Sequence, residues 1–345
     1  MRERIVKKLC TSILFIAVLC LNSYAGQVQR FAELGDFRLD SGEVIRDCKV
    51  GYRTFGHLNA NRSNAIIYPS WFGGTSEHLG KLIGGPEKLV DSTGFFIIAF
   101  DAFGNGISSS PSNSIRQPGD KFPVFTIHDM VRAQYEILTQ KMNIDHLHAA
   151  IGGSMGSFQV FEWLVSYPQF IDKAIPYVCS PRMTSYERLI LNFQMDLIEA
   201  GTAAEMPQDT LIKLLEMFTA ITGRTPEYLV KEISREEFPG YISRFDKVAP
   251  TIFTPANKAS QIRAMLTHDI SRNFKGSLEK AGESICAEVA IIVSASDHIV
   301  RPEPALELAR HMNWRITILD NNCGHLAIGC EMERCVKIVN EFLRE

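Results

Sequence analysis

The sequence predicts an α/β protein with a mostly parallel, doubly wound sheet and an inserted helical cap. Short apolar runs alternate along the chain with segments of helical periodicity. The runs are hydrophobic almost throughout, which is typical of strands buried on both faces. Only helical patterns are found in residues 181–273. We therefore expect a core made of residues 26–180 and 274–345, with residues 181–273 as the cap.

Residues 1–25 have the layout of a secretory signal peptide. Residues 1–8 carry four cations and one Glu, residues 9–21 are almost wholly apolar, and small residues (Ser23, Ala25) precede a cleavage site. This apolar run is shorter than the ~20 residues that span a bilayer, which disfavours the alternative of a membrane anchor. We expect an exported protein, periplasmic or secreted, with no membrane association after removal of the signal.

Composition excludes several classes of protein. The 345 residues are 46% hydrophobic and 22% charged, as in globular proteins, and the net charge of −3 without a long basic run disfavours nucleic acid as a partner. No CxxC pair, HExxH motif or dinucleotide fingerprint is present, so we expect no metal and no cofactor. We expect at most one disulfide among the six cysteines beyond the signal, Cys48, Cys179, Cys286, Cys323, Cys330 and Cys335.

The expected elements follow in chain order. Residues 31–39 and 48–55 alternate in polarity and predict an antiparallel hairpin at one edge of the sheet. Buried strands are expected at 65–68, 95–100, 148–151, 174–178, 289–293 and 316–319. Core helices are expected at 127–142, 155–165, 302–312 and 332–342, and cap helices at 186–199, 209–222, 225–233 and 259–268.

The most specific motif is Gly152-Gly153-Ser154-Met155-Gly156, a G-x-S-x-G sequence between an expected strand and an expected helix. In this context it forms a nucleophile elbow, a sharp turn that exposes the serine Oγ at the edge of an α/β-hydrolase sheet. The helix N-terminus also favours negative charge that develops there. We therefore expect Ser154 to be a catalytic nucleophile.

A serine hydroxyl needs a base within hydrogen-bond reach and an acid to orient that base, and in this fold the chain order is Ser, acid, His. Asp297 follows an expected strand, and His325 lies behind Gly324 on the loop after the last strand. We expect these two as orienting acid and general base. Asp320 is the alternative acid and His298 the alternative base.

The oxyanion of the tetrahedral intermediate needs two donors. We expect the backbone N–H of Met155 and that of Trp71, with Phe72 as the alternative to Trp71.

Several stretches resemble the homoserine O-acetyltransferase family. Residues 122–134, FPVFTIHDMVRAQ, are similar to its F-P-x-x-T-I-R-D-M-V-R-A-Q segment. The elbow with Glu162-Trp163 and Tyr167-Pro168 downstream, and Arg263-Ala264-Met265 with His268-Asp269, also match. The likeness runs from about residue 35 to the C-terminus. It implies an α/β-hydrolase core, a helical cap, the triad of Ser154, Asp297 and His325, and a homodimer through the cap.

The departures from this family bear on the substrate. Leu326 follows His325 where the family has aspartate, and His128 replaces an arginine. The family's substrate-binding cap arginine has no clear match, since Ile221 occupies its ungapped position and Arg224 lies three residues away. A buried, unpaired homoserine carboxylate would be costly, which argues against homoserine as substrate. Arg182 and Arg224 are the expected contacts for an anionic substrate group.

We therefore expect a serine-dependent enzyme that works through an acyl-Ser154 intermediate and hydrolyses a small ester. A first alternative is an O-acetyltransferase that moves an acetyl group from acetyl-CoA to homoserine or a similar alcohol. A second is a non-catalytic binding protein that kept the fold. The expected partner is a small-molecule ester or acyl donor.

Overall fold

The structure is a computed structural model that describes residues 28–246 and 251–345, so the expected signal peptide lies outside the described residues. Its centre is an eight-stranded sheet in the order β1-β2-β6-β3-β7-β8-β9-β10. β1 (Arg30–Arg38) and β2 (Val44–Phe55) form the antiparallel hairpin at one edge, and β2 pairs antiparallel with β6. The remaining strands are parallel: β3 (Ala65–Pro69), β6 (Phe96–Phe100), β7 (Leu147–Gly153), β8 (Ile171–Tyr177), β9 (Glu288–Ser294) and β10 (Arg315–Leu319).

Side chains of successive strand residues enter the two opposite layers of the core, as the pleat requires. In β3, Ile67 belongs to one buried cluster and Ile66 to the other, and Val293 and Ile292 of β9 divide in the same way. One layer contains α3 (Ile127–Glu136), α4 (Met155–Ser166) and α11 (Glu303–His311). The opposite layer contains α2 (Ser76–Gly80) and α13 (Met332–Arg344). This is the doubly wound α/β-hydrolase fold that the sequence predicts.

Short elements complete the core. The helix expected at 127–142 continues beyond α3 as a π-helical turn, η2 (Ile137–Lys141). A two-stranded sheet, β4 (Ile83–Gly84) with β5 (Val90–Asp91), was not predicted because two-residue strands leave no periodic pattern. The other short elements are η1 (Gly119–Lys121), η4 (Arg272–Phe274), α10 (Leu278–Glu283), η5 (Gly324–Leu326) and α12 (Ala327–Cys330).

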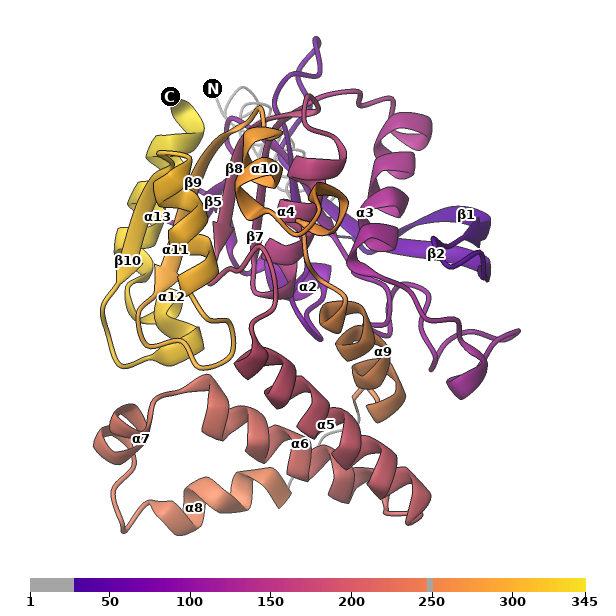
Figure 1. Ribbon diagram of the computed structural model, residues 1–345, viewed down its shortest axis with the longest axis vertical. Helices are drawn as coiled ribbons and strands as arrows, with labels where there is room; N and C mark the ends of the chain where they lie inside the picture. Colours follow the sequence, from indigo (N-terminus) through magenta and orange to yellow (C-terminus); the bar gives the residue numbers. More distant parts are fainter. Residues whose placement is uncertain (1–27, 247–250) are drawn as a thin grey trace, which may run out of the picture.

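The helices between β8 and η4 form a separate layer that lies below the sheet in Figure 1. They are α5 (Ser185–Ala203), α6 (Gln208–Gly223), α7 (Pro226–Glu232), α8 (Phe238–Ser243), η3 (Arg244–Asp246) and α9 (Pro255–Leu266). The only β contact in the described part of residues 181–273 is an isolated bridge between Arg182 and Asp269. In the described part of the chain, no helix is both long and apolar enough to cross a membrane. Because the strands that carry the expected site are parallel, their carboxyl ends all face this helical layer.

Candidate active site

Ser154 lies in the turn between β7 and α4, with backbone angles φ 54° and ψ −128°. Non-glycine residues rarely adopt a positive φ, and such strain is concentrated at functional sites. The flanking glycines make room for the turn: a Cβ at Gly153 would lie 2.0 Å from the Tyr177 ring, and one at Gly156 would lie 2.6 Å from the Pro69 carbonyl oxygen. The local sequence therefore explains how the hydroxyl reaches the sheet edge.

A continuous hydrogen-bond chain joins three segments that are far apart in sequence. The Ser154 hydroxyl donates to His325 Nε2 at 2.9 Å, and His325 Nδ1–H donates to Asp297 Oδ2 at 2.7 Å. Asp297 is only 1% exposed, and its Oδ1 accepts the N–H groups of Ile299 (2.8 Å) and Val300 (2.9 Å). These two bonds hold the carboxyl group in place, and its bond to Nδ1 in turn fixes the imidazole tautomer that can take the serine proton.

The alternative acid and the alternative base take no part in this chain of hydrogen bonds. Asp320 is exposed, and His298, directly after Asp297, is half-buried. No hydrogen bond or ion pair joins either of them to Ser154 or His325. The structure thus brings together Ser154, Asp297 and His325.

The loop that carries His325 is held from both sides. A disulfide between Cys323 and Cys330 closes it around the histidine. On the core side, Gly324 N–H donates to Ser296 Oγ at 3.2 Å. On the cap side, Thr225 Oγ1 donates to the Asn322 carbonyl at 2.7 Å. Such pre-organisation keeps the base in hydrogen-bond reach of its nucleophile.

The expected oxyanion donors both lie next to Ser154: Met155 follows it in the chain, and Trp71 lines the same cavity. Met155 begins α4, so its N–H has no partner within the helix. The segment with Trp71 and Phe72 follows β3 and is tied to α4, because Gln159 Nε2 donates to the Ser70 carbonyl at 3.0 Å. Both Trp71 and Phe72 line the cavity above Ser154, so the structure leaves both available as the second donor.

A mostly apolar cavity of about 550 Å³ opens over Ser154 and His325. Its floor includes Trp71 and Phe158 from the core, and its roof includes Ile190, Leu191 and Met265 from the cap. No Asp or Glu is among the described residues that line it. The cavity therefore suits an uncharged substrate of modest size.

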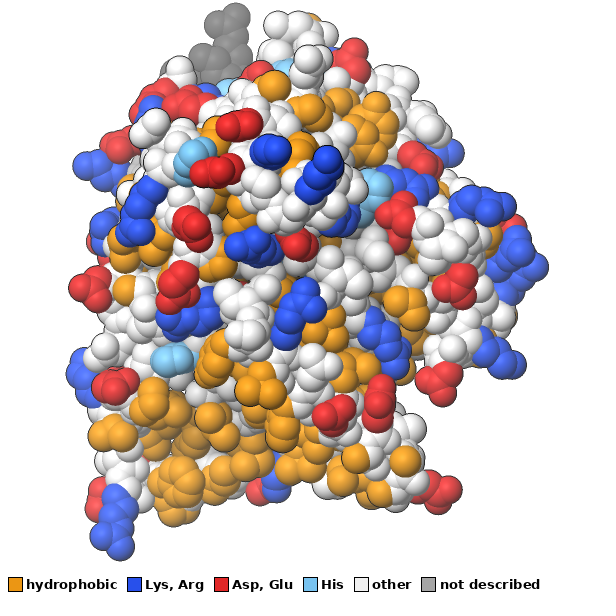
Figure 2. Space-filling model, in the orientation of Figure 1, with side chains coloured by type: hydrophobic (Ala, Val, Ile, Leu, Met, Phe, Trp, Pro, Cys, Tyr) orange, Lys and Arg blue, Asp and Glu red, His pale blue; other side chains and the backbone are white. Residues whose placement is uncertain are grey.

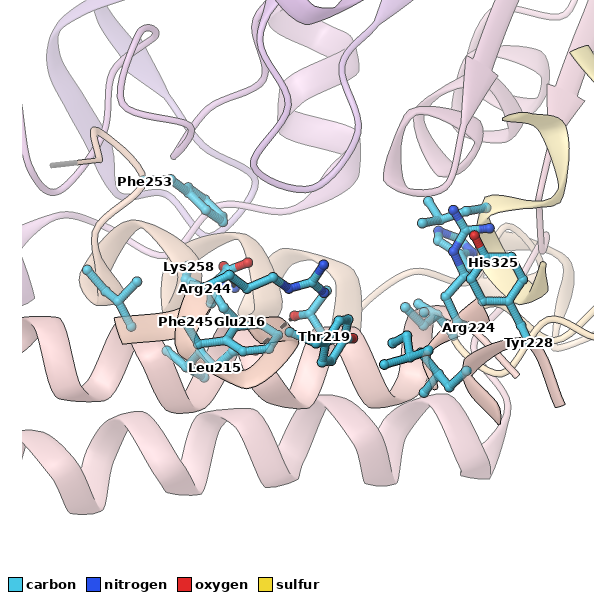
Figure 3. A pocket seen from close by; sticks show the side chains of 18 of the residues that line it. Leu215, Glu216, Thr219, Arg224, Tyr228, Arg244, Phe245, Phe253, Lys258 and His325 are labelled. Atoms are coloured by element: carbon cyan, nitrogen blue, oxygen red, sulfur yellow. Dashed lines mark hydrogen bonds and ion pairs between the residues drawn. The ribbon is translucent and has the colours of Figure 1, made fainter. Parts of the chain in front are cut away.

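A second cavity, of about 1010 Å³, meets the first at His325 and is lined by residues of α6, α7 and α8 (Figure 3). His325, Arg224 and Tyr228 lie at one end, and Lys258, Arg244, Phe245 and Glu216 at the other. Lys258 is buried, with its Nζ 3.6 Å from Glu216 Oε1, and burial lowers the pKa of its ammonium group. This cavity is more polar and lies farther from the nucleophile.

The two arginines expected to contact the substrate differ in position. Arg224 lines both cavities, but its guanidinium stacks on Tyr228 at 4.3 Å and contacts the Cys323 carbonyl at 3.4 Å. Arg182 lines neither cavity: its backbone bridges Asp269, and its guanidinium approaches the Gly276 carbonyl. The expectation of a substrate contact fails for Arg182 because the chain leaves β8 with this side chain turned toward the α9–α10 connection.

The sequence reasoning missed Gln194 and Thr225. Gln194 interrupts the buried stripe of α5, and such a polar residue in an apolar stripe is a usable signal. Thr225 caps the N-terminus of α7 and also holds the His325 loop, which its local sequence does not reveal. Among residues 28–246 and 251–345, no cluster of three or more His, Cys, Asp or Glu side chains is arranged to hold a metal.

Comparisons with known proteins agree with this geometry. A probable esterase of Corynebacterium glutamicum is 28% identical over 344 residues, covering 93% of this chain and 97% of its own. An ethyl acetate hydrolase of Pseudomonas veronii is 29% identical over 313 residues (86% and 88%). A homoserine O-acetyltransferase of Geotalea daltonii is 28% identical over 360 residues (90% and 95%).

A comparison with solved structures supports the fold. The crystal structure of an acetylester hydrolase from Corynebacterium glutamicum superposes with a TM-score of 0.83 at 24% identity, over 92% of this chain and 96% of the other. The profile of the alpha/beta hydrolase fold matches residues 70–329, which is most of the chain. The resemblance to homoserine O-acetyltransferases is thereby confirmed, together with the kinship to esterases. The chain therefore belongs to the alpha/beta hydrolase fold family, as an enzyme of the serine hydrolase and acyltransferase kind with a Ser-Asp-His triad.

Proposed function

We propose that this enzyme hydrolyses small, uncharged esters of short acids, with Ser154 as nucleophile, His325 as general base and acid, and Asp297 as orienting acid. The hydrogen-bond chain of these three residues, opening into an apolar cavity without a lining carboxylate, is the observation that carries the proposal. The names of two relatives, an ethyl acetate hydrolase and a probable esterase, support this substrate class.

The reaction follows from the distances. Ser154 Oγ attacks the ester carbonyl while its proton passes to His325 Nε2, 2.9 Å away. The carbonyl oxygen becomes an oxyanion, and the N–H groups of Met155 and of Trp71 or Phe72 stabilise it. His325 then gives the proton to the leaving alcohol, which leaves an acyl-Ser154 ester. Water, deprotonated by His325, attacks this ester. The bond between the acyl carbon and Ser154 Oγ breaks, His325 returns the proton to Oγ, and the acid is released.

Water is favoured as the acceptor because the Ser154 cavity offers nothing to an amino acid's ammonium group. Leu326, 50% exposed, lines both cavities at the position where the homoserine O-acetyltransferases have aspartate. An ammonium group buried there without a carboxylate would be strongly disfavoured. Transfer of an acetyl group from acetyl-CoA to homoserine therefore remains the second candidate.

Two measurements test the proposal. A fluorophosphonate probe is expected to label the parent enzyme and not Ser154→Ala, and the absence of labelling in the parent would contradict the catalytic role of Ser154. Turnover of ethyl acetate is then compared with and without homoserine. Formation of O-acetylhomoserine faster than free acetate would replace hydrolysis by transfer as the function.

We also propose that the protein acts after export, with residues 1–25 removed. The basic and apolar segments of the N-terminus and the Cys323–Cys330 disulfide support this, since disulfides persist in oxidising compartments. Fractionation of the producing cells followed by N-terminal sequencing tests it. Activity in the cytosolic fraction, with Met1 retained, would contradict it.

Assembly through the cap is a further part of the proposal. Apolar side chains gather over the lower, cap-bearing part of the surface (Figure 2). On α5, Tyr186, Leu189 and Phe193 are 45%, 69% and 51% exposed. A second copy of the chain covering them would bury this apolar surface. Sedimentation of the parent and of Leu189→Glu tests this, and a monomeric parent would contradict it.

A further inference from the structure

Gln194 is an unpaired polar group in the apolar roof of the Ser154 cavity. It lies on α5, one helical turn after Ile190 and Leu191, which line the same cavity. The residue is only 6% exposed, and its Oε1 is shut off from solvent with no donor in reach. Its amide forms no hydrogen bond with any other described residue. A buried amide in this state destabilises the protein unless a partner arrives.

Four other polar side chains that line this cavity have partners within the protein. Thr219 and Thr222 donate from Oγ1 to the carbonyls one turn back in α6, at 2.9 and 3.0 Å. The Tyr177 hydroxyl pairs with that of Tyr68 at 2.5 Å. Arg224 is held by Tyr228 and the Cys323 carbonyl. Gln194 thus stands out among the described residues that line this cavity as a buried side chain whose amide oxygen has no hydrogen-bond partner.

The residues that line the cavity indicate which kind of ligand group would hydrogen-bond to the Gln194 amide. An amide has one acceptor oxygen and two N–H donors, and a half-turn about χ3 presents either arm to the cavity. A cationic donor is disfavoured because no carboxylate is among the described lining residues. An anion is disfavoured because the guanidinium in the lining, that of Arg224, is already engaged. A neutral hydroxyl, which both donates and accepts, fits the amide.

We propose that Gln194 is a specificity-determining residue that binds a hydroxyl group on the substrate, so that the preferred substrates are small hydroxy-esters. This inference rests on the proposed ester hydrolysis and narrows its substrate class. The hydroxyl lies on the acyl part or on the alcohol part of the ester, and both present the same group to the amide.

Two matched substrate pairs locate the hydroxyl. For the acyl part, 4-nitrophenyl 3-hydroxybutyrate is compared with 4-nitrophenyl 3-methylbutyrate. For the alcohol part, 2-hydroxyethyl acetate is compared with propyl acetate. In the parent enzyme we expect kcat/KM to favour the hydroxylated member of one pair by about tenfold to a hundredfold, because the analogue leaves the amide unpaired.

The variant Gln194→Met keeps the length of the side chain and removes its polar atoms. We expect it to reduce that preference to near one by slowing the hydroxylated ester much more than the apolar ester. Its Tm is expected to equal or exceed that of the parent, because an unsatisfied buried amide is gone. Asn192→Met, at an exposed position of the same helix, is the control and should change neither quantity.

The outcomes separate the two claims. If the parent hydrolyses both members of both pairs equally, or if Gln194→Met slows both members alike and lowers the Tm, the role of Gln194 is overturned while ester hydrolysis stands. If the parent hydrolyses none of the four esters, the proposed function falls and this inference falls with it.

Discussion

The rim of the core, where the triad lies, and the helical cap differ in how completely their polar atoms are hydrogen-bonded. At the rim, the Asp297 carboxylate accepts three hydrogen bonds, and His325 is bonded at both ring nitrogens. In the described part of the cap, Gln194 Oε1 and His268 Nδ1 are buried without partners. The core is thus pre-organised for the chemistry, whereas the cap keeps unmet hydrogen-bonding capacity. We therefore expect the first region to determine reactivity, and the second to determine substrate selectivity and the pH dependence of stability.

The largest expected effect concerns the rim. His325→Ala removes the base from a chain in which each member depends on the next. We expect kcat to fall on the order of 10⁶-fold, with little change in KM. Steady-state kinetics on ethyl acetate measure this, and His298→Ala is the control beside the same loop. A loss of less than a hundredfold would mean that another group acts as base.

The next effect concerns the cap. His268 is fully buried, and burial lowers its pKa to about 4, from an ordinary value of 6.5. Between these pH values the unfolded chain binds a proton that the folded chain does not. The free energy of unfolding therefore falls as the pH drops from 6.5 to about 4, by up to about 3 kcal/mol, and this contribution levels off below.

His268→Gln is expected to remove that part of the slope, which urea unfolding at several pH values between 4 and 7 measures. His146→Gln is the control, because His146 is an exposed histidine paired with Asp172. Parallel slopes for His268→Gln and the parent would show that the imidazole does not carry the effect.

A smaller effect concerns the contact between the two regions. Thr225→Val removes the hydrogen bond from the cap to the Asn322 carbonyl, which positions the His325 loop. We expect kcat to fall about tenfold, as for the loss of about 1.4 kcal/mol, with KM retained. Thr225→Ser should restore the parent rate, since it keeps the hydroxyl.

The matched control is Thr254→Val, which removes the equivalent N-cap of α9 away from this loop. It should lower stability by about 1 kcal/mol and leave kcat unchanged. Equal kcat values for the two valine variants would show that Thr225 acts only as a helix cap.

The smallest effect concerns the disulfide. Replacing Cys323 and Cys330 by Ser removes one constraint on the loop. The hydrogen bond from Gly324 N–H to Ser296 and that from Thr225 to the Asn322 carbonyl remain. We expect kcat to fall on the order of threefold, which is less than 1 kcal/mol. Cys286→Ser, at an exposed free cysteine, should have no effect. If kcat falls more than in Thr225→Val, the disulfide contributes more than the Thr225 hydrogen bond to positioning the His325 loop.

Sequence reasoning succeeded where short-range rules apply. The elbow at Ser154 is a local motif, and Asp297 and His325 follow strands whose ends must meet because the strands are parallel. The strands and the long helices could also be predicted, because the spacing of their apolar residues is a short-range pattern.

It failed where long-range packing decides. The direction of Arg182 depends on how the cap packs on α9. The half-exposed pattern of β10 reflects its place at the sheet edge, which its apolar sequence alone does not reveal.

The backbone at Ser154 has a consequence for engineering. Its torsion angles lie where only glycine is at ease, and holding another residue there costs on the order of 1–3 kcal/mol. Ser154→Gly would therefore give a protein that is more stable to unfolding but has no nucleophile and no activity. Directed evolution that selects for thermal stability without also selecting for turnover would therefore favour this inactive variant.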